Sequence, residues 1–278
     1  MTIIELAPHH KVGLTLANPI MPAAGCFGTG REYAPLIDLA ALGAVVVGPV
    51  TGRPRRGSEP PRLLPVPSGV LLHTGLANPG ISALIRQAVR VWRSSPLPVI
   101  VHVAGTDTDE VASCCERLAA VEAVAGVEMG LPDAATPELA ADLTRAACTS
   151  ANRPVLVRLP LADADRLCEA AAAAGADALT VAAPPRGTAW HPGAGRYISG
   201  RLYGPFVLPL ALRALRRVAE MVSLPLVGCG GITAIEDAAA FLRAGAVAVQ
   251  IDSALWRDPS SLARLARALA PEVLASAD

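Results

Sequence analysis

Several residue types are scarce in this chain of 278 residues, and each scarcity narrows its function. Lys11 is the only lysine, and the 24 basic residues are matched by 24 acidic ones, so the net charge is zero. A chain without a basic excess has no general attraction to nucleic acid or to an anionic membrane surface. We therefore expect neither nucleic acid nor membrane as a partner.

Signal sequences and long apolar runs are also missing. The N-terminal stretch MTIIELAPHHKVG has no basic start followed by a long apolar segment, which is the pattern of a secretory signal. No uncharged run of about 18 residues indicates a membrane span. These absences predict a soluble, cytoplasmic protein.

The cysteines follow no metal-binding pattern. They contain no CxxC pair and no Cys/His spacing that suits zinc, so we expect small, mostly buried thiols in a reducing compartment and no metal. Their positions are Cys26, Cys114, Cys115, Cys148, Cys168 and Cys229.

Apolar residues, in contrast, are abundant and regularly spaced. Hydrophobic residues make up 52% of the chain, enough for a large core. Short runs rich in Val and Ile predict buried strands at 20–24, 44–48, 99–104, 127–130, 155–159, 178–183, 226–229 and 246–251. Helical patterns occupy 32–40, 81–93, 107–119, 136–149, 163–173, 209–222, 235–244 and 260–268.

Eight strand–helix units in one chain predict a (β/α)₈ TIM barrel that forms a single domain over residues 1–278. An open, doubly wound sheet is the alternative, and the regularity of the eight units disfavours it. Two long segments, 51–78 and 184–208, interrupt the rhythm. In a barrel both would lie on the C-terminal face, where active sites are built. Arginines and prolines gather in the first segment, which suits a protein interface or a solvated loop.

Five stretches, in order, carry a family resemblance. They are NPIMPAAGCFGTGREYA at 18–34, LGAVVVGPVTGRPRRGSEPPRLL at 42–64, HTGLANPG at 73–80, YGPFVLPLALR at 203–213 and PLVGCGGITAIEDAAAFLRAGAVAVQIDSAL at 225–255. Together they make the chain similar to the soluble, class 1 type of dihydroorotate dehydrogenase. The resemblance implies an FMN across the barrel mouth, with its phosphate on backbone N–H groups after the last two strands. It also implies a Cys or Ser base on a loop, which takes a proton from dihydroorotate while hydride passes to the flavin.

The flavin side of the resemblance is altered. Gly48 stands where the family has a lysine beside the flavin ring, and Asp252 stands where it has the glycine of a phosphate loop. A carboxylate about 4 Å from a phosphate costs on the order of 4 kcal/mol, so we expect no FMN in this chain. The vestigial flavin and phosphate site comprises Ala24, Gly25, Gly48, Arg158, Tyr203, Gly204, Gly230, Gly231, Asp252 and Ser253.

The substrate side is altered as well. His73 and His102 replace two asparagines of the family, and Asn78 remains, so these three form a remnant of the substrate pocket. The family's Asn-x-Ser-Cys-Pro-Asn motif, which carries the base, has become the shorter stretch 130–133. The resemblance therefore leaves no catalytic residue. A metal or general-base site made from His73, His102 and His191 with Asp133 or Glu128 is an alternative, which no HxH or HExxH spacing supports.

All of these replacements remove groups that bind flavin or substrate or carry out catalysis, and together they lead to a functional hypothesis. We expect a non-catalytic subunit that binds and supports a catalytic, FMN-bearing dihydroorotate dehydrogenase homologue in a hetero-oligomer of pyrimidine biosynthesis, with FMN only in the partner. The alternative is an FMN-dependent, dihydroorotate dehydrogenase-like oxidoreductase of altered substrate specificity, which would hold the flavin through the remaining backbone groups.

Overall fold

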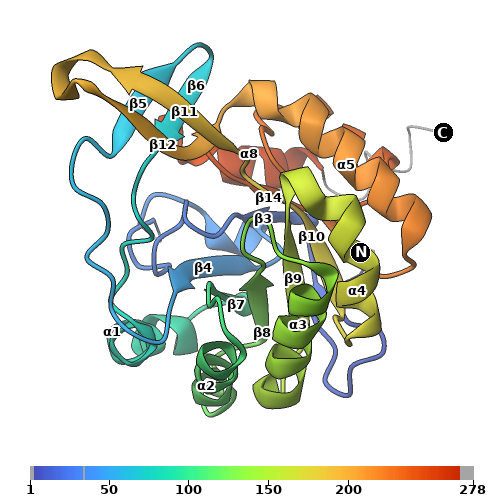
Figure 1. Cartoon of the computed structure of the whole chain (residues 1–278). Helices are drawn as coiled ribbons and strands as arrows, with labels where there is room; N and C mark the ends of the chain where they lie inside the picture. The colour runs from blue at the N-terminus through green and yellow to red at the C-terminus, as the bar shows by residue number, and fades with distance from the viewer. Residues whose placement is uncertain (1–2, 34, 270–278) are drawn as a thin grey trace.

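The structure, a computed structural model, describes residues 3–33 and 35–269. Its centre is a barrel of eight parallel strands (Figure 1). The strands are β3 (Ile20–Pro22), β4 (Val45–Val50), β7 (Val99–Val103), β8 (Gly126–Gly130), β9 (Val155–Pro160), β10 (Ala178–Ala183), β13 (Leu226–Cys229) and β14 (Ala248–Ile251). Their order is β3-β14-β13-β10-β9-β8-β7-β4. The N–H of Gly43 donates to the carbonyl of Ile20 across the seam between β3 and β4. The predicted (β/α)₈ barrel is confirmed.

Helices surround the barrel, as Figure 1 shows. They are α1 (Ile81–Arg93), α2 (Thr108–Ala119), α3 (Pro137–Ala151), α4 (Ala164–Ala173), α5 (Leu208–Met221), α6 (Ile235–Arg243), α7 (Ala254–Arg257) and α8 (Ser261–Ala268), with 3₁₀ helices η1 (Leu39–Ala41), η2 (Leu161–Asp163), η3 (Pro192–Ala194) and η4 (Pro205–Val207). Thr136 accepts from the N–H of Leu139 and Pro137 opens α3, the expected start of a helix. No described helix combines the length and the apolar character needed to cross a membrane.

One predicted helix is wrong. Over 32–40 the described residues form turns followed by η1. Pro35 lies in this segment, and a proline inside a helix removes a backbone hydrogen bond and clashes with the preceding turn. The apolar spacing alone had suggested a helix.

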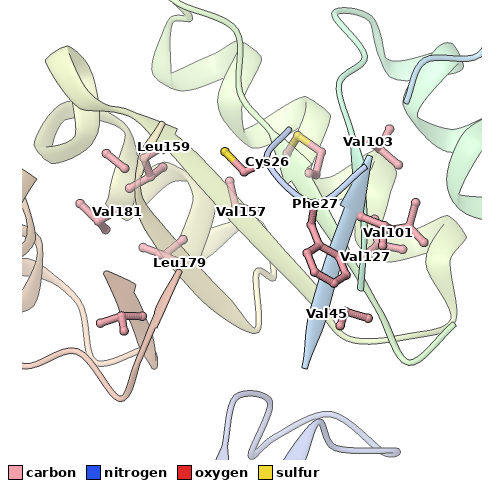
Figure 2. Close-up of a cluster of buried hydrophobic side chains, with 14 of the residues drawn as sticks. Cys26, Phe27, Val45, Val101, Val103, Val127, Val157, Leu159, Leu179 and Val181 are labelled. Atoms are coloured by element: carbon pink, nitrogen blue, oxygen red, sulfur yellow. The ribbon is translucent and has the colours of Figure 1, made fainter. Parts of the chain in front are cut away.

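The strands separate two hydrophobic layers because successive side chains point to opposite faces. Outward residues such as Val101, Val127 and Val157 pack in the large cluster under the helices (Figure 2). Inward residues such as Val46 and Ile100 form a second cluster inside the barrel. Apolar packing therefore fixes which strand residues point into the barrel.

A short N-terminal hairpin covers the end of the barrel at which the parallel strands begin. It consists of β1 (Ile4–Glu5) and β2 (Thr15–Leu16), which pair antiparallel. Leu6, Leu14 and Leu16 pack into the inner cluster. The Glu5 carboxylate accepts from the N–H groups of Ala7 and Leu14 and fixes the turn. The hairpin thereby closes this end of the barrel and leaves the other end open to a ligand.

The two long interruptions meet at the other end and form one sheet. The first contains β5 (Leu63–Val66) and β6 (Gly69–Leu72), and the second contains β11 (Arg186–His191) and β12 (Arg196–Tyr203). The sheet order is β11-β12-β6-β5, with β12 antiparallel to β6. Figure 1 shows this four-stranded sheet projecting from the barrel. We call it the roof sheet.

Candidate active site

A cavity of about 760 Å³ lies between the barrel mouth and the roof sheet. The barrel contributes Ala24, His102 and Arg158 to its lining, and the roof side contributes His73 and Arg201. Because the mouth of a barrel collects the C-terminal ends of all its strands, side chains from distant sequence segments converge there. The cavity is therefore the first place to look for chemistry.

A layer of polar side chains forms its floor. They are His102, Glu128, Arg158, Thr180 and Gln250. Four of them lie two residues beyond a member of the inner cluster, and Glu128 lies two beyond Gly126, whose Cβ position faces Leu14 and Ile100, so strand alternation points all five inward. The register places His102 beside Glu128, and Arg158 beside Thr180. All five are buried. A buried polar layer in an apolar barrel is stable only if its groups pair with each other.

Glu128 is the centre of that layer. One carboxylate oxygen accepts from Thr180 Oγ1 at 2.8 Å and from Gln250 Nε2 at 2.6 Å. The other lies 2.6 Å from His102 Nδ1 and 3.5 Å from Arg158 Nη1. Burial alone would raise the pKa of Glu128, but Arg158 and His102 outweigh it and lower the pKa to about 2. Glu128 is therefore ionised at neutral pH and held by four partners.

Arg158 supplies the countercharge. Its guanidinium donates to Gln250 Oε1 at 2.9 Å and to Cys229 Sγ at 3.0 Å. Burial raises the pKa of Cys229 to about 12 although Arg158 lowers it, so this thiol stays protonated and is not an activated nucleophile. Burial likewise raises the pKa of Cys26. Neither cysteine at the strand ends is prepared for catalysis.

His102 connects the buried layer with the cavity. Nδ1 faces Glu128, and the ring lines the cavity with only 8% of the residue exposed. Gly130, on the adjacent strand, leaves space beside Nε2, because a Cβ at that position would lie 2.8 Å from this atom. Nδ1 is thus fixed by Glu128, and Nε2 lies beside the space that the missing side chain of Gly130 leaves in the cavity wall.

The backbone turns that resemble a phosphate site hold an anion of the chain itself. The Asp252 carboxylate accepts from the N–H of Ser253 at 2.5 Å, from Ser253 Oγ at 3.1 Å and, more weakly, from the N–H of Gly231 at 3.4 Å. Burial raises the pKa of Asp252, while its hydrogen bonds with Ser253 and Gly231 act in the opposite direction. These N–H groups therefore form an anion cradle, which the chain's own carboxyl occupies.

The described cavity ends before this cradle. Tyr203 lines the cavity, whereas Gly231, Asp252 and Ser253 do not. Tyr203 packs edge-on against Trp256 with ring centroids 4.9 Å apart. Burial raises the pKa of Tyr203, so its phenol remains protonated. Tyr203 therefore lines the cavity, while the Asp252 carboxyl occupies the cradle outside it.

The cavity wall is rich in arginine. Arg55, Arg62, Arg186 and Arg201 line it together with one carboxylate, Asp133. Asp133 bridges Arg186 at 2.6 Å and Arg201 at 2.8 Å. Burial would raise the pKa of Asp133, but the two arginines hold it below its usual range. The wall therefore keeps a positive excess, which favours an anionic ligand.

Other positions singled out in the sequence have structural roles or lie elsewhere. Asn78 fastens the base of the first interruption, since its Oδ1 accepts from the N–H groups of Thr51 and Gly80. Gly48 has a positive φ of 101°, and a Cβ there would lie 2.9 Å from the His102 carbonyl. His191 accepts from the N–H of Ala194 in the roof sheet. Within 3–33 and 35–269, no three His, Cys, Asp or Glu side chains converge as a metal site.

Sequence reasoning did not identify the polar layer as a unit. The sequence does not single out Thr180 and Gln250, and it offers Glu128 only as a possible member of a metal or general-base site with the histidines. The signal is nevertheless present, because His102, Glu128, Arg158 and Gln250 each interrupt an otherwise apolar strand. Four such interruptions at the same depth of the barrel mark an inward-facing polar site.

The chain is similar to known proteins over nearly its whole length. A family model described as dihydroorotate dehydrogenase matches residues 8–273. A protein of Desulforudis audaxviator is 38% identical over 270 residues, which cover 91% of this chain and 88% of that protein. Proteins of Anoxybacillus flavithermus and Geobacillus kaustophilus are 37% and 36% identical over 263 residues, or 89% of this chain and 84% of each relative. All three are described as dihydroorotate dehydrogenase B (NAD(+)), catalytic subunit.

These findings correct two expectations from the sequence. The interpretation as a non-catalytic partner of a catalytic homologue is wrong, because the relatives that match along nine-tenths of the chain are themselves catalytic subunits. The expectation of no FMN in this chain is wrong for the same reason. Its physical premise was an Asp252 carboxylate directed at the phosphate, whereas this carboxyl is hydrogen-bonded to Ser253 and Gly231.

Proposed function

Because the chain belongs to the dihydroorotate dehydrogenase family, we propose that it is the catalytic chain of an FMN-dependent oxidoreductase with altered substrate specificity. It would remove a proton and a hydride from adjacent carbons of a small anionic ring compound. The observation that carries the proposal is the cavity at the barrel mouth, where arginines face a floor that contains His102.

The cofactor end of the proposal rests on the anion cradle. Backbone N–H groups of Gly231 and Ser253, with the Ser253 hydroxyl, would hold the FMN phosphate in place of the Asp252 carboxyl. That they already bind a carboxyl supports their fit to an anion. When bound, the flavin supplies a hydride acceptor. Tyr203 and Asp252 would turn aside on binding, which is a rearrangement of side chains.

The substrate end rests on charge. Arg55 and Arg62 approach the cavity from the first interruption and Arg186 and Arg201 from the second, against Asp133 alone. A guanidinium matches a carboxylate in shape and charge, and it can bind both oxygens. We therefore propose that the substrate carries a carboxylate. His73 and His102, in place of amides, would change which ring groups are recognised.

The relatives' names bear on assembly and electron flow. They describe subunits and include NAD⁺, and we propose on that basis that this chain works with a different subunit in an NAD⁺-linked enzyme. Co-purification with chains encoded in the same source tests this assembly. Recovery of the chain only as itself, fully active with NAD⁺, would contradict it.

The experiment for the function begins with the purified chain loaded with FMN. Dihydroorotate and its neutral analogue dihydrouracil, which lacks the carboxylate, are added anaerobically, and loss of flavin absorbance is followed. We expect reduction by carboxylated dihydropyrimidines and little or none by dihydrouracil. The double variant Arg55→Gln, Arg62→Gln should raise the substrate concentration needed for half-reduction. No reduction by any carboxylated compound of this class would refute the proposal.

A further inference from the structure

Two histidines line the same cavity, and the structure holds them in different ways. His73 Nδ1 lies 2.6 Å from the carbonyl oxygen of Ser199. His102 Nδ1 lies 2.6 Å from the carboxylate of Glu128. A carbonyl orients an imidazole, whereas an ionised carboxylate also stabilises the imidazolium that forms when the ring accepts a proton. His102 is therefore the better prepared proton acceptor.

The carboxylate behind His102 is fixed and charged. Glu128 is fully buried and accepts hydrogen bonds from Thr180 and Gln250 in addition to its contacts with His102 and Arg158. A charged acceptor at Nδ1 requires the proton of a neutral imidazole to reside on Nδ1. The lone pair then lies on Nε2, which is the nitrogen beside the gap at Gly130.

The gap at Gly130 is a second, independent feature. Gly130 does not have a positive φ, so its backbone does not require glycine there. What the position requires is the absence of a side chain, because a Cβ would come within 2.8 Å of His102 Nε2 and 2.9 Å of its Cε1. The glycine thus keeps Nε2 accessible from the cavity.

Other acid–base groups that line the cavity are less suitable. Asp133 is bound by Arg186 and Arg201, and burial raises the pKa of Tyr203 above its ordinary value. The stretch 130–133 carries neither serine nor cysteine. Around His102 itself, β8 contributes Glu128 and β9 contributes Arg158, while the neighbouring end of β4 contributes Gly48 and Pro49, which do not titrate.

We propose that His102 is the base of the proposed oxidation and that Glu128 is its positioning residue. Nε2 accepts the proton from the substrate carbon next to the one that loses hydride. The electron pair of the broken C–H bond forms the new C=C bond, and the hydride goes to the flavin that the proposed function requires. The imidazolium is then balanced by Glu128. This inference rests on the proposed function and adds its acid–base group.

The first test compares His102→Ala and Gly130→Ala with the wild-type chain, each loaded with FMN and given dihydroorotate. Loss of the base should lower kcat by about 10²- to 10⁴-fold, and added imidazole should restore part of the rate in His102→Ala only. Gly130→Ala keeps every charge of the layer but places a Cβ 2.8 Å from Nε2, so it should lower kcat and also the melting temperature, while FMN affinity stays close to wild type.

The second test uses pH. The acid limb of the wild-type kcat/KM profile should shift in Glu128→Gln and vanish in His102→Ala. His73→Gln is the matched control: it should alter KM and keep the limb. A His102→Ala chain with wild-type kcat and an unchanged limb overturns the inference and leaves the proposed function standing. A wild-type chain that oxidises no carboxylated dihydropyrimidine removes both.

Discussion

Asp252 allows the proposed FMN phosphate site to be tested directly. Replacing it with glycine removes the carboxyl that occupies the N–H groups of Gly231 and Ser253. Under the proposed function, FMN would have to displace this carboxyl in the wild-type chain but not in Asp252→Gly. The variant should therefore bind FMN more tightly.

The size of the effect follows from the hydrogen bonds that Asp252 makes. The two short contacts, 2.5 and 3.1 Å, both involve Oδ1 and Ser253, and the contact with Gly231 at 3.4 Å is weak. We count these as one hydrogen bond to a charged group, about 1.5–3 kcal/mol. Relief of that cost should lower the Kd for FMN by about 10- to 100-fold.

The assay is a titration of apoprotein with FMN, followed by quenching of flavin fluorescence. Asp252→Asn keeps the shape but offers a neutral acceptor, so its Kd should lie between the two. Asp258→Asn removes a nearby carboxylate that contacts Ser260 and Arg264 instead of the cradle, and it should leave the Kd unchanged. Since protonation also weakens the internal bond, the difference between wild type and Asp252→Gly should narrow as the pH falls. Equal or weaker FMN binding by a folded Asp252→Gly chain would refute the reasoning.

The remaining predictions concern the charged groups around the cavity. Glu128→Gln should lower the free energy of unfolding by about 3 kcal/mol at neutral pH, because it leaves Arg158 buried without its countercharge. The pKa of Glu128 is lowered from 4.5 to about 2 on folding, so its contribution is complete above about pH 4.5 and is lost as the pH falls toward 2. Urea titrations across that window should show a steeper loss in wild type than in Glu128→Gln, and parallel slopes would contradict this. Asp133→Asn removes two partly exposed ion pairs and should cost about 1 kcal/mol or less, yet proteolysis within 186–203 should become faster; an unchanged cleavage rate would show that these pairs do not hold the roof sheet.

The barrel could be predicted from sequence because strands buried on both faces are almost continuously apolar. All eight strands were recognised within a few residues, and the start of α3 followed from Thr136 and Pro137. The helix predicted over 32–40 is wrong because Pro35 interrupts a segment whose apolar spacing is otherwise helical. Secondary structure could therefore be predicted wherever it depends mainly on the residues of the segment itself.

The site was harder to predict because its parts depend on distant segments. Glu128 and Gln250 are 122 residues apart, and only the closed barrel brings them to 2.6 Å. The sequence gives the formal charge of Asp252 but not the burial that raises its pKa or the hydrogen bonds that occupy it. Comparison with a family's residues, position by position, revealed which groups had gone. It did not reveal that a different set of polar groups had taken their place inside the barrel.

The pairing of β6 with β12 has a consequence for how this protein could acquire new ligands. Leu72 pairs with Arg201 across a sheet whose two hairpins come from interruptions more than a hundred residues apart. A loop transplanted from a homologue into one interruption alone would meet a foreign edge strand and lose its backbone partners. The two interruptions therefore form one structural unit. Recombination with a homologue should preserve the roof sheet only when residues 51–78 and 184–208 are exchanged together.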